Sequence, residues 1–259
     1  MKFFFSETAH DYKSYYFPYQ VWLLKEKDDD LAKIYESGFL PFRNKSNLFY
    51  LSRSCRVDLK NFSLSSENRR AIKKTGDFNF KIEKLANFDY QPRVQKLCKD
   101  WARTCRWRIS TKSLKYLFGG QYFNYIFVWK KDDEEIGFQI IFQNSKLAHT
   151  GHVFYDANKA GKNLGMRMLI EASLWAKKEG KNYNYLGTCY DKGRYKWNFN
   201  SLEFFNGFEW SLNDKEWKYL GQRTSENYLL REKAYLKEFT KTANIEEILS
   251  SKGISFKLK

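Results

Sequence analysis

The sequence contains few of the residues that build loops, metal sites and disulfide frameworks. It has 3 prolines, 3 histidines and 4 cysteines in 259 residues, and no C-x-x-C pair. We therefore expect neither a structural zinc site nor a disulfide framework, and scattered thiols of this kind indicate a reducing, cytoplasmic location. The apolar start of the chain is interrupted at Ser6 and Glu7, which argues against a signal peptide. No run of about 18 apolar residues occurs, so no membrane span is expected.

Aromatic and basic residues, by contrast, are abundant. Hydrophobic residues make up 42% of the chain and aromatic residues 19%, which is enough for a sizeable core and excludes a disordered chain. The chain has 46 Lys and Arg against 30 Asp and Glu, a net charge of +16. Such a charge attracts polyanions such as nucleic acids, although a lysine-rich surface that only keeps the protein in solution would look the same.

The order of the hydrophobic patterns predicts an α/β (α+β) fold. Residues 122–130, 136–142 and 147–155 read as consecutive strands, 164–178 as an amphipathic helix and 183–190 as a strand parallel to its predecessor. Strand, helix and parallel strand form one crossover unit. Alternation along the strand 147–155 would place His149 and Gly151 on one face, and His152 on the other.

Three regions follow from these patterns. Residues 1–75 form a smaller N-terminal α+β module, residues 76–223 a larger domain around the crossover unit, and residues 224–259 a charged helical extension. Within the first region, Ser65 and Ser66 are capping residues for a helix that ends at Lys74. This helix presents a basic face that is suited to phosphates, although a solvated face is the alternative. The face consists of Arg69, Arg70, Lys73 and Lys74.

The turn before the helix 164–178 contains glycine. Enzymes of the N-acetyltransferase superfamily that use acetyl-CoA carry R/Q-x-x-G-x-G/A at this place, where small residues let backbone amides approach a pyrophosphate. The nearest match here runs from Lys162 through Gly165 to Arg167, so an arginine stands where the pattern has a small residue. We therefore expect the N-acetyltransferase-like (GNAT) mixed sheet flanked by helices without the usual CoA site, and an ordinary loop would also explain this turn.

Three titratable residues near this unit are candidates for proton transfer. Glu171 lies on the apolar stripe of the helix, where a carboxylate must be paired or functional. Asp156 closes the preceding strand, and His152 lies four residues earlier. The alternatives are a structural ion pair for Glu171, a turn cap for Asp156 and a structural role for His152.

A segment at 191–199 mixes cations with aromatic residues, a composition that can bind an anion or stack on a nucleobase. A surface loop whose aromatic residues turn into the core is the alternative. The relevant residues are Lys192, Arg194, Tyr195, Lys196, Trp197 and Phe199.

Taken together, these blocks resemble the arginyl-tRNA–protein transferases and their bacterial leucyl-transferring relatives. The C-terminal part of the resemblance comprises Phe154-Tyr155-Asp156, Leu164-Gly165, Leu169, Glu171, Ala176, Gly180, Tyr183, Tyr185-Leu186-Gly187, Arg194-Tyr195-Lys196 and Phe199. The N-terminal part comprises Gly38-Phe39, Phe49-Tyr50 and the stretch 63–70. Both blocks keep the family's order and cover most of residues 30–210.

The resemblance implies transfer of Arg or Leu from an aminoacyl-tRNA to the α-amine of a protein that begins with Asp or Glu. The aminoacyl-tRNA is then a co-substrate, and no separate cofactor or metal is expected. The family's N-terminal cysteine cluster is reduced here to Cys55, and its Met before Tyr-Lys is Arg194.

In this interpretation each candidate residue has a role. Asp156 and Glu171 would transfer the proton, and Tyr195 would position the acceptor or the terminal adenosine. Arg194 and Lys196 would hold the acceptor carboxylate or a 3′-terminal phosphate, since an arginine fork binds a carboxylate bidentately. The remaining substrate-binding candidates are Tyr155, His152 and Gly165, and the tRNA-binding candidates are Arg69, Arg70, Lys73, Lys74 and Lys192.

Three other functions fit the same patterns. The first is an acetyl-CoA-dependent N-acetyltransferase, and the second is a relative that binds tRNA or RNA without catalysis. The third is a peptidoglycan-type aminoacyl transferase, which would share the donor and differ in the acceptor.

Overall fold

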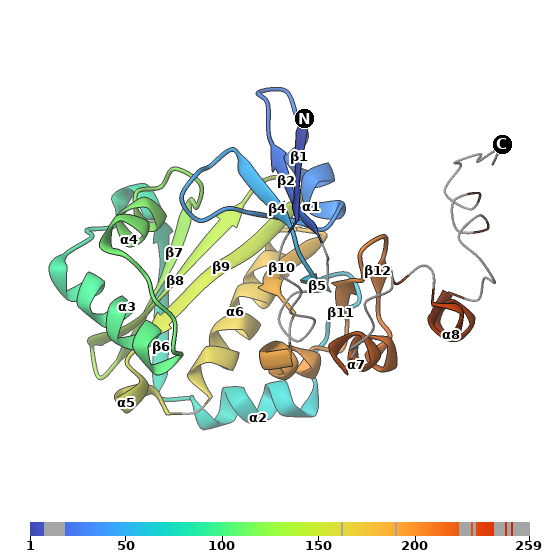
Figure 1. Cartoon of the computed structure of the whole chain (residues 1–259). Helices are drawn as coiled ribbons and strands as arrows, with labels where there is room; N and C mark the ends of the chain where they lie inside the picture. The colour runs from blue at the N-terminus through green and yellow to red at the C-terminus, as the bar shows by residue number, and fades with distance from the viewer. Residues whose placement is uncertain are drawn as a thin grey trace.

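A computed structural model describes residues 1–7, 19–161, 163–189, 191–222 and 232–240, together with residues 229, 247 and 250. The strands form two sheets, of which the smaller has the order β1-β2-β4-β3 and the larger the order β12-β11-β5-β10-β9-β8-β7-β6 (Figure 1). The small sheet contains β1 (Lys2–Glu7), β2 (Tyr19–Leu24), β3 (Phe39–Pro41) and β4 (Leu48–Leu51). The large sheet contains β5 (Ser54–Asp58), β6 (Phe78–Lys84), β7 (Tyr125–Lys131), β8 (Glu134–Gln143), β9 (Leu147–Tyr155), β10 (Tyr183–Thr188), β11 (Leu202–Phe205) and β12 (Trp210–Ser211).

Helices cover both faces of the large sheet. They are α1 (Leu31–Glu36), α2 (Ser66–Lys74), η1 (Leu85–Asn87), α3 (Pro92–Thr104), α4 (Thr111–Phe118), α5 (Ala157–Ala160), α6 (Leu164–Lys178), η2 (Asp191–Asn198), α7 (Asp214–Gln222), α8 (Lys233–Tyr235) and η4 (Leu236–Thr240). This arrangement confirms the predicted α/β class and the mixed sheet flanked by helices. No helix in the described part of the chain combines the length and the hydrophobicity needed to cross a bilayer.

Alternation along β7 and β8 separates two cores. Ile126 and Ile140 face α3 and α4 on one side of the sheet, whereas Phe127 and Ile141 face α6 on the other. Each core is closed by the apolar stripe of its helices, as the period of 3.6 residues requires. The two cores fix the large sheet between its two helical layers.

The N-terminal region divides between the two sheets. Its first strands form the small sheet, which packs on the start of β9 and β10 through Leu147 and Tyr185. Its strand β5, however, lies between β10 and β11 in the large sheet, and α2 packs on α6. Residues 1–75 therefore contribute both a small sheet of their own and integral parts of the large one. Gly38 lies between α1 and β3 at φ 84°, where a side chain would overlap the ring of Phe205 in β11.

Most of the predicted elements are present with shifted ends. The helix predicted at 164–178 is confirmed at both ends, and the α2 cap is a reciprocal capping box between Ser65 and Asn68. The predicted strand 183–190 ends at Thr188, and the predicted 191–199 loop is largely the 3₁₀-helix η2. Much of the predicted C-terminal extension lies outside the described residues.

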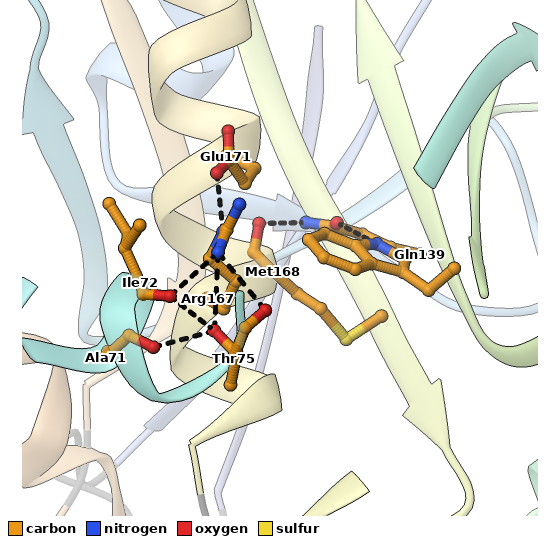
Figure 2. A network of polar contacts seen from close by, with 8 residues as sticks. Ala71, Ile72, Thr75, Gln139, Arg167, Met168 and Glu171 are labelled. Atoms are coloured by element: carbon orange, nitrogen blue, oxygen red, sulfur yellow. Dashed lines mark hydrogen bonds and ion pairs between the residues drawn. The ribbon is translucent and has the colours of Figure 1, made fainter. Parts of the chain in front are cut away.

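A polar network ties α2 to α6 (Figure 2). The guanidinium of Arg167 donates to the carbonyl oxygens of Ile72 at 3.1 Å and Thr75 at 3.4 Å, and its Nε pairs with Glu171 at 2.5 Å. On the sheet side of α6, Gln139 donates to the Met168 carbonyl at 3.0 Å. Arg167 thus satisfies carbonyls at the end of α2, a role that a small residue at this position could not fill.

A cationic cavity where two parallel strands separate

A cavity of about 730 Å³ lies where β9 and β10 separate. The two strands pair in parallel only from Tyr183 and Leu147 to Tyr185 and His149. Beyond this pair they diverge, and residues 150–153 of β9 and 186–188 of β10 line the cavity. The other walls come from β3 and the β3–β4 turn, from α3 and α4, and from η2. This is the place in the fold where two open strand edges offer backbone groups to a ligand.

A β-bulge at Gly151 determines which side chains of β9 face the cavity. His152 pairs with Ile140 and Thr150 with the next residue, Ile141, so Gly151 is the extra residue of β9. The extra residue moves His152 onto the same face as His149, toward α3 and α4. The predicted alternation, with the two histidines on opposite faces, is therefore wrong, because it assumed an uninterrupted strand. A side chain at Gly151 would overlap the buried ring of Phe123.

The cavity lining is positively charged. Its titratable residues include Arg43 and Lys196 and the two histidines, whereas none of the described lining residues is Asp or Glu. Burial and then Lys196 lower the pKa of His149 to about 3. Burial and then Arg43 lower the pKa of His152 to about 3 as well. Both imidazoles are therefore neutral at pH 7, and the permanent charge in the cavity comes from Arg43 and Lys196.

Arg43 is held over an aromatic ring. Its guanidinium carbon lies 4.5 Å from the centre of the Trp107 ring, and the His152 ring stacks on Trp107 at 5.5 Å and 17°. Burial lowers the pKa of Arg43, but arginine stays protonated in proteins. Among the residues that the structure describes, no carboxylate pairs with Arg43. A stacked guanidinium without an ion pair among the described residues suits a carboxylate or a phosphate.

Lys196 occupies the open edge of β10. Its Nζ, on a side chain only 7% exposed, donates to the carbonyl oxygens of Leu186 at 2.7 Å and Thr188 at 2.6 Å. These carbonyls lie past the point where β9 leaves β10, so the ammonium replaces the strand that no longer pairs there. Burial alone would lower the pKa of Lys196, but the nearby Cys55, Tyr195 and Cys189 side chains together outweigh it, and the net shift of the pKa is upward. Lys196 is thus a charged residue that holds the two strands apart.

A chain of hydroxyl groups orients His149. Its Nδ1 lies 2.7 Å from the Tyr35 hydroxyl, which lies 2.5 Å from the Tyr122 hydroxyl. If Tyr122 donates to Tyr35 and Tyr35 donates to Nδ1, every hydroxyl proton in the chain has an acceptor. The reverse order would leave the Tyr122 proton without an acceptor among the described side chains. The first order places the imidazole proton on Nε2.

The structure brings three of the residues predicted from sequence to this cavity, namely His152, Tyr195 and Lys196. Tyr195 is 48% exposed at its edge. The side chains of Lys192 and Arg194 lie outside the described residues. The predicted tRNA-binding residues Arg69, Arg70, Lys73 and Lys74 are exposed on α2 and do not line the cavity.

Four other predicted residues lie away from the cavity. Asp156 caps α5 by accepting from the Asn158 amide at 2.9 Å, and Glu171 forms its ion pair with Arg167. These are the structural roles that the sequence left open as alternatives. Tyr155 packs against the first turn of α6, where its hydroxyl would lie 3.0 Å from a Cβ at Gly165.

Sequence reasoning missed the residues that matter most to this geometry. Arg43, Trp107, His149, Tyr35 and Tyr122 come from four separate segments of the chain. Only the ordered fold brings them together, and the bulge at Gly151 has no sequence signature beyond a glycine inside a strand. The glycine inside the predicted strand was the one sequence feature that could have indicated the bulge.

Comparisons with known proteins give fold-level likenesses only. No protein-family model and no curated protein matches the sequence. Among solved structures, the C-terminal domain of an Agrobacterium fabrum protein named as a lysylphosphatidylglycerol synthetase is 15% identical with a TM-score of 0.45, and L-PGS from Bacillus licheniformis is 17% identical with a TM-score of 0.41. Each match covers 65% of this chain and 54% of the other.

An acetyl-CoA-bound GNAT family acetyltransferase from Elizabethkingia anophelis is 13% identical with a TM-score of 0.30, and the match covers 40% of this chain and 61% of that one. At these identities and scores, the three likenesses carry no argument about function.

Proposed function

We propose that this protein transfers an amino acid from an aminoacyl-tRNA to an amine that carries a nearby anionic group, specifically the α-amine of a protein N-terminal Asp or Glu. The observation that carries the proposal is the cavity between β9 and β10, whose described lining holds two permanent cations and no carboxylate. An acidic acceptor matches this lining, whereas a cationic or purely apolar one does not.

The groups in the cavity support an aminoacyl-tRNA as the donor. The ester between an amino acid and a tRNA is already activated, so the protein has to orient the two reactants and stabilise the oxyanion. A neutral imidazole that donates from Nε2 supplies the second need, since the Tyr35 hydroxyl occupies Nδ1 of His149. Such a ring acts as a hydrogen-bond donor to a developing oxyanion rather than as a base.

Arg43 has the geometry to hold the acceptor. Its guanidinium lies over Trp107 and lines the cavity together with His152. It can donate two parallel hydrogen bonds to a carboxylate. The α-amine of the same residue would then lie within reach of an ester carbonyl placed near His149. Tyr195, at the exposed edge of the cavity, is placed to contact the incoming donor.

The environment of α6 argues against acetyl-CoA as the donor. CoA enzymes hold a pyrophosphate at the N-terminus of this helix, yet no described residue of its first turn lines the cavity, and Leu169 is the earliest residue of α6 that does. Arg167 is also committed to Glu171 and α2. The described residues that line the cavity therefore do not include the first turn of α6, where a pyrophosphate would lie.

The test is transfer of radiolabelled amino acids from a mixed pool of charged tRNA to peptides beginning with Asp, Glu, Arg or Ala. We expect label on the Asp and Glu peptides, and single amino acids then identify the donor. Label on none of the peptides, together with micromolar binding of CoA, would replace the proposal with an N-acetyltransferase.

A further inference from the structure

The segment from Trp101 in α3 to Tyr116 in α4 contains both residues that line the cavity and a series of exposed cations. Trp101, Trp107 and Tyr116 line the cavity from this segment. Between them, the chain from Arg103 to Lys115 contains five cations and no carboxylate. These cations, Arg103, Arg106, Arg108, Lys112 and Lys115, are all exposed.

Backbone geometry fixes which residues point where. Arg106 has φ 54°, a left-handed conformation that is uncommon for a residue with a side chain. The Arg106 amide bonds to the Arg103 carbonyl at 2.9 Å, and the Trp107 amide bonds to the Ala102 carbonyl at 2.8 Å. This tight turn directs Trp107 into the cavity while Arg106 and Arg108, on either side of it, stay in solvent. Backbone strain that is maintained by specific hydrogen bonds occurs preferentially at functional sites.

Most of these cations are uncommitted. Arg103 pairs with Asp100 at 2.8 Å. For Arg106, Arg108, Lys112 and Lys115, the described part of the chain provides no ion-pair partner. Arg43, from the β3–β4 turn, lies over the same Trp107 and extends the positive charge into the cavity. Arg106 and Arg108 therefore flank, in the sequence, the same Trp107 ring over which Arg43 lies, so both groups of cations adjoin this wall of the cavity.

The basic helix α2 also exposes its cations, and Lys73 and Lys74 have no ion-pair partner in the described part of the chain, but two features set α2 apart. Arg70 pairs with Glu67 at 2.7 Å, and the Arg69 guanidinium donates to the Leu64 carbonyl at 2.6 Å. None of the α2 cations adjoins a residue that lines the cavity. A polyanion that must deliver its end into the cavity is better served by the α3–α4 surface than by α2.

We propose that the α3–α4 surface, defined by Arg106, Arg108, Lys112 and Lys115, is an RNA-docking surface that guides a single-stranded 3′ end over Trp107 into the cavity. This inference rests on the proposed function, of which it names the tRNA contact. Cations alternating with aromatic rings are typical of single-strand binding, where phosphates meet the cations and bases stack on the rings.

A membrane fits this surface less well than RNA does. Interfacial binding needs apolar side chains that project from a basic face. The large hydrophobic residues exposed in the described part of the chain lie elsewhere, on β1, on β6, in η2 and after β12. On α3–α4 the aromatic rings instead line a cavity that a single strand can enter.

Two matched double variants test this surface on the full chain. Arg106→Glu/Arg108→Glu and Arg69→Glu/Arg70→Glu change the net charge equally and involve the same residue types. Binding of a fluorescent single-stranded RNA ending in CCA, and of uncharged tRNA, is measured by anisotropy at several salt concentrations, with circular dichroism as the check on folding. We expect the first variant to lose at least 10-fold in affinity with a shallower salt dependence, and the second to lose less than 3-fold.

Equal losses in both variants, or a larger loss in the α2 variant, would overturn the inference, as would binding to vesicles of anionic lipid in preference to RNA. The less disruptive variant Lys112→Gln/Lys115→Gln keeps the test decisive if the arginine reversal unfolds the protein, and it should weaken RNA binding at least 3-fold. RNA binding at this surface without transfer of any amino acid would leave the surface established and remove the proposed function.

Discussion

His149 and His152 lie on the same face of β9 although they are three residues apart, because Gly151 between them is an unpaired bulge residue. In a regular strand the two rings would point to opposite faces. The bulge thus gives the cavity two neutral imidazoles instead of one, and it does so at the point where β9 parts from β10.

A first prediction concerns this bulge. Replacement Gly151→Ala should lower the free energy of unfolding by about 1–3 kcal/mol, because the new methyl overlaps the buried Phe123 ring. The double variant Gly151→Ala/Phe123→Leu should recover part of this loss, since the ring is then gone. Urea unfolding measures both, and an additive loss in the double variant would show that the ring is not the cause.

The buried lysine allows a second prediction. Lys196→Met should destabilise the protein by about 2–4 kcal/mol, because the carbonyls of Leu186 and Thr188 lose their donor. The matched control Lys215→Met removes an exposed lysine from α7 and should change stability by less than about 0.5 kcal/mol. If both variants unfold at the same urea concentration as the wild type, Lys196 does not hold the strands apart.

A third prediction is a dependence of stability on pH. The folded pKa values of His149 and His152 are about 3, below the ordinary 6.5. The unfolded chain therefore binds more protons between these values, so the stability present above pH 6.5 is lost as the pH falls. The loss is up to about 1.4 kcal/mol per pH unit for each ring.

Chemical unfolding between pH 7 and 5 measures this dependence before most carboxylates titrate. The variant His152→Phe should show a shallower decline than the wild type, because one titrating ring is removed while the stacking on Trp107 is kept. An unchanged slope would mean that His152 is not protected from protonation in the folded protein.

The fold was more accessible to sequence reasoning than the site. The helix 164–178 and the strands around it have a strong hydrophobic period, which depends only on near neighbours in the chain. Arg43, Trp107 and His149 have no such local signature. They become a site through the small sheet, the α3–α4 turn and the bulge, which depend on contacts between residues distant in the sequence.

The distribution of cations in the sequence indicated α2, rather than the α3–α4 surface, as the basic surface. Four cations on one helix are conspicuous in α2, whereas the cations of the α3–α4 segment are spread over a helix end, a turn and a second helix. Glu171 and Asp156 likewise drew attention because carboxylates are common in catalysis. In the structure, these two residues have backbone or ion-pair partners outside the cavity.

A fourth prediction separates catalysis from binding at His149. Tyr35→Phe removes the hydroxyl that bonds to Nδ1, which frees the imidazole to adopt the wrong tautomer. We expect kcat for amino-acid transfer to fall at least 10-fold with little change in the acceptor KM. Tyr183→Phe removes a hydroxyl outside the cavity lining and serves as the control. A rise in KM at unchanged kcat would show that the tyrosine shapes the acceptor site instead.

The most direct test of the account is the selectivity of transfer for Asp over Asn at the acceptor N-terminus, measured as a ratio of kcat/KM in the wild type and in Arg43→Ala. The two peptides differ only in the carboxylate, which the Arg43 guanidinium is proposed to bind from its place over Trp107. The account predicts a ratio of at least 10 in the wild type that falls toward 1 in the variant. A wild-type ratio near 1, or a high ratio that persists in Arg43→Ala, would contradict it.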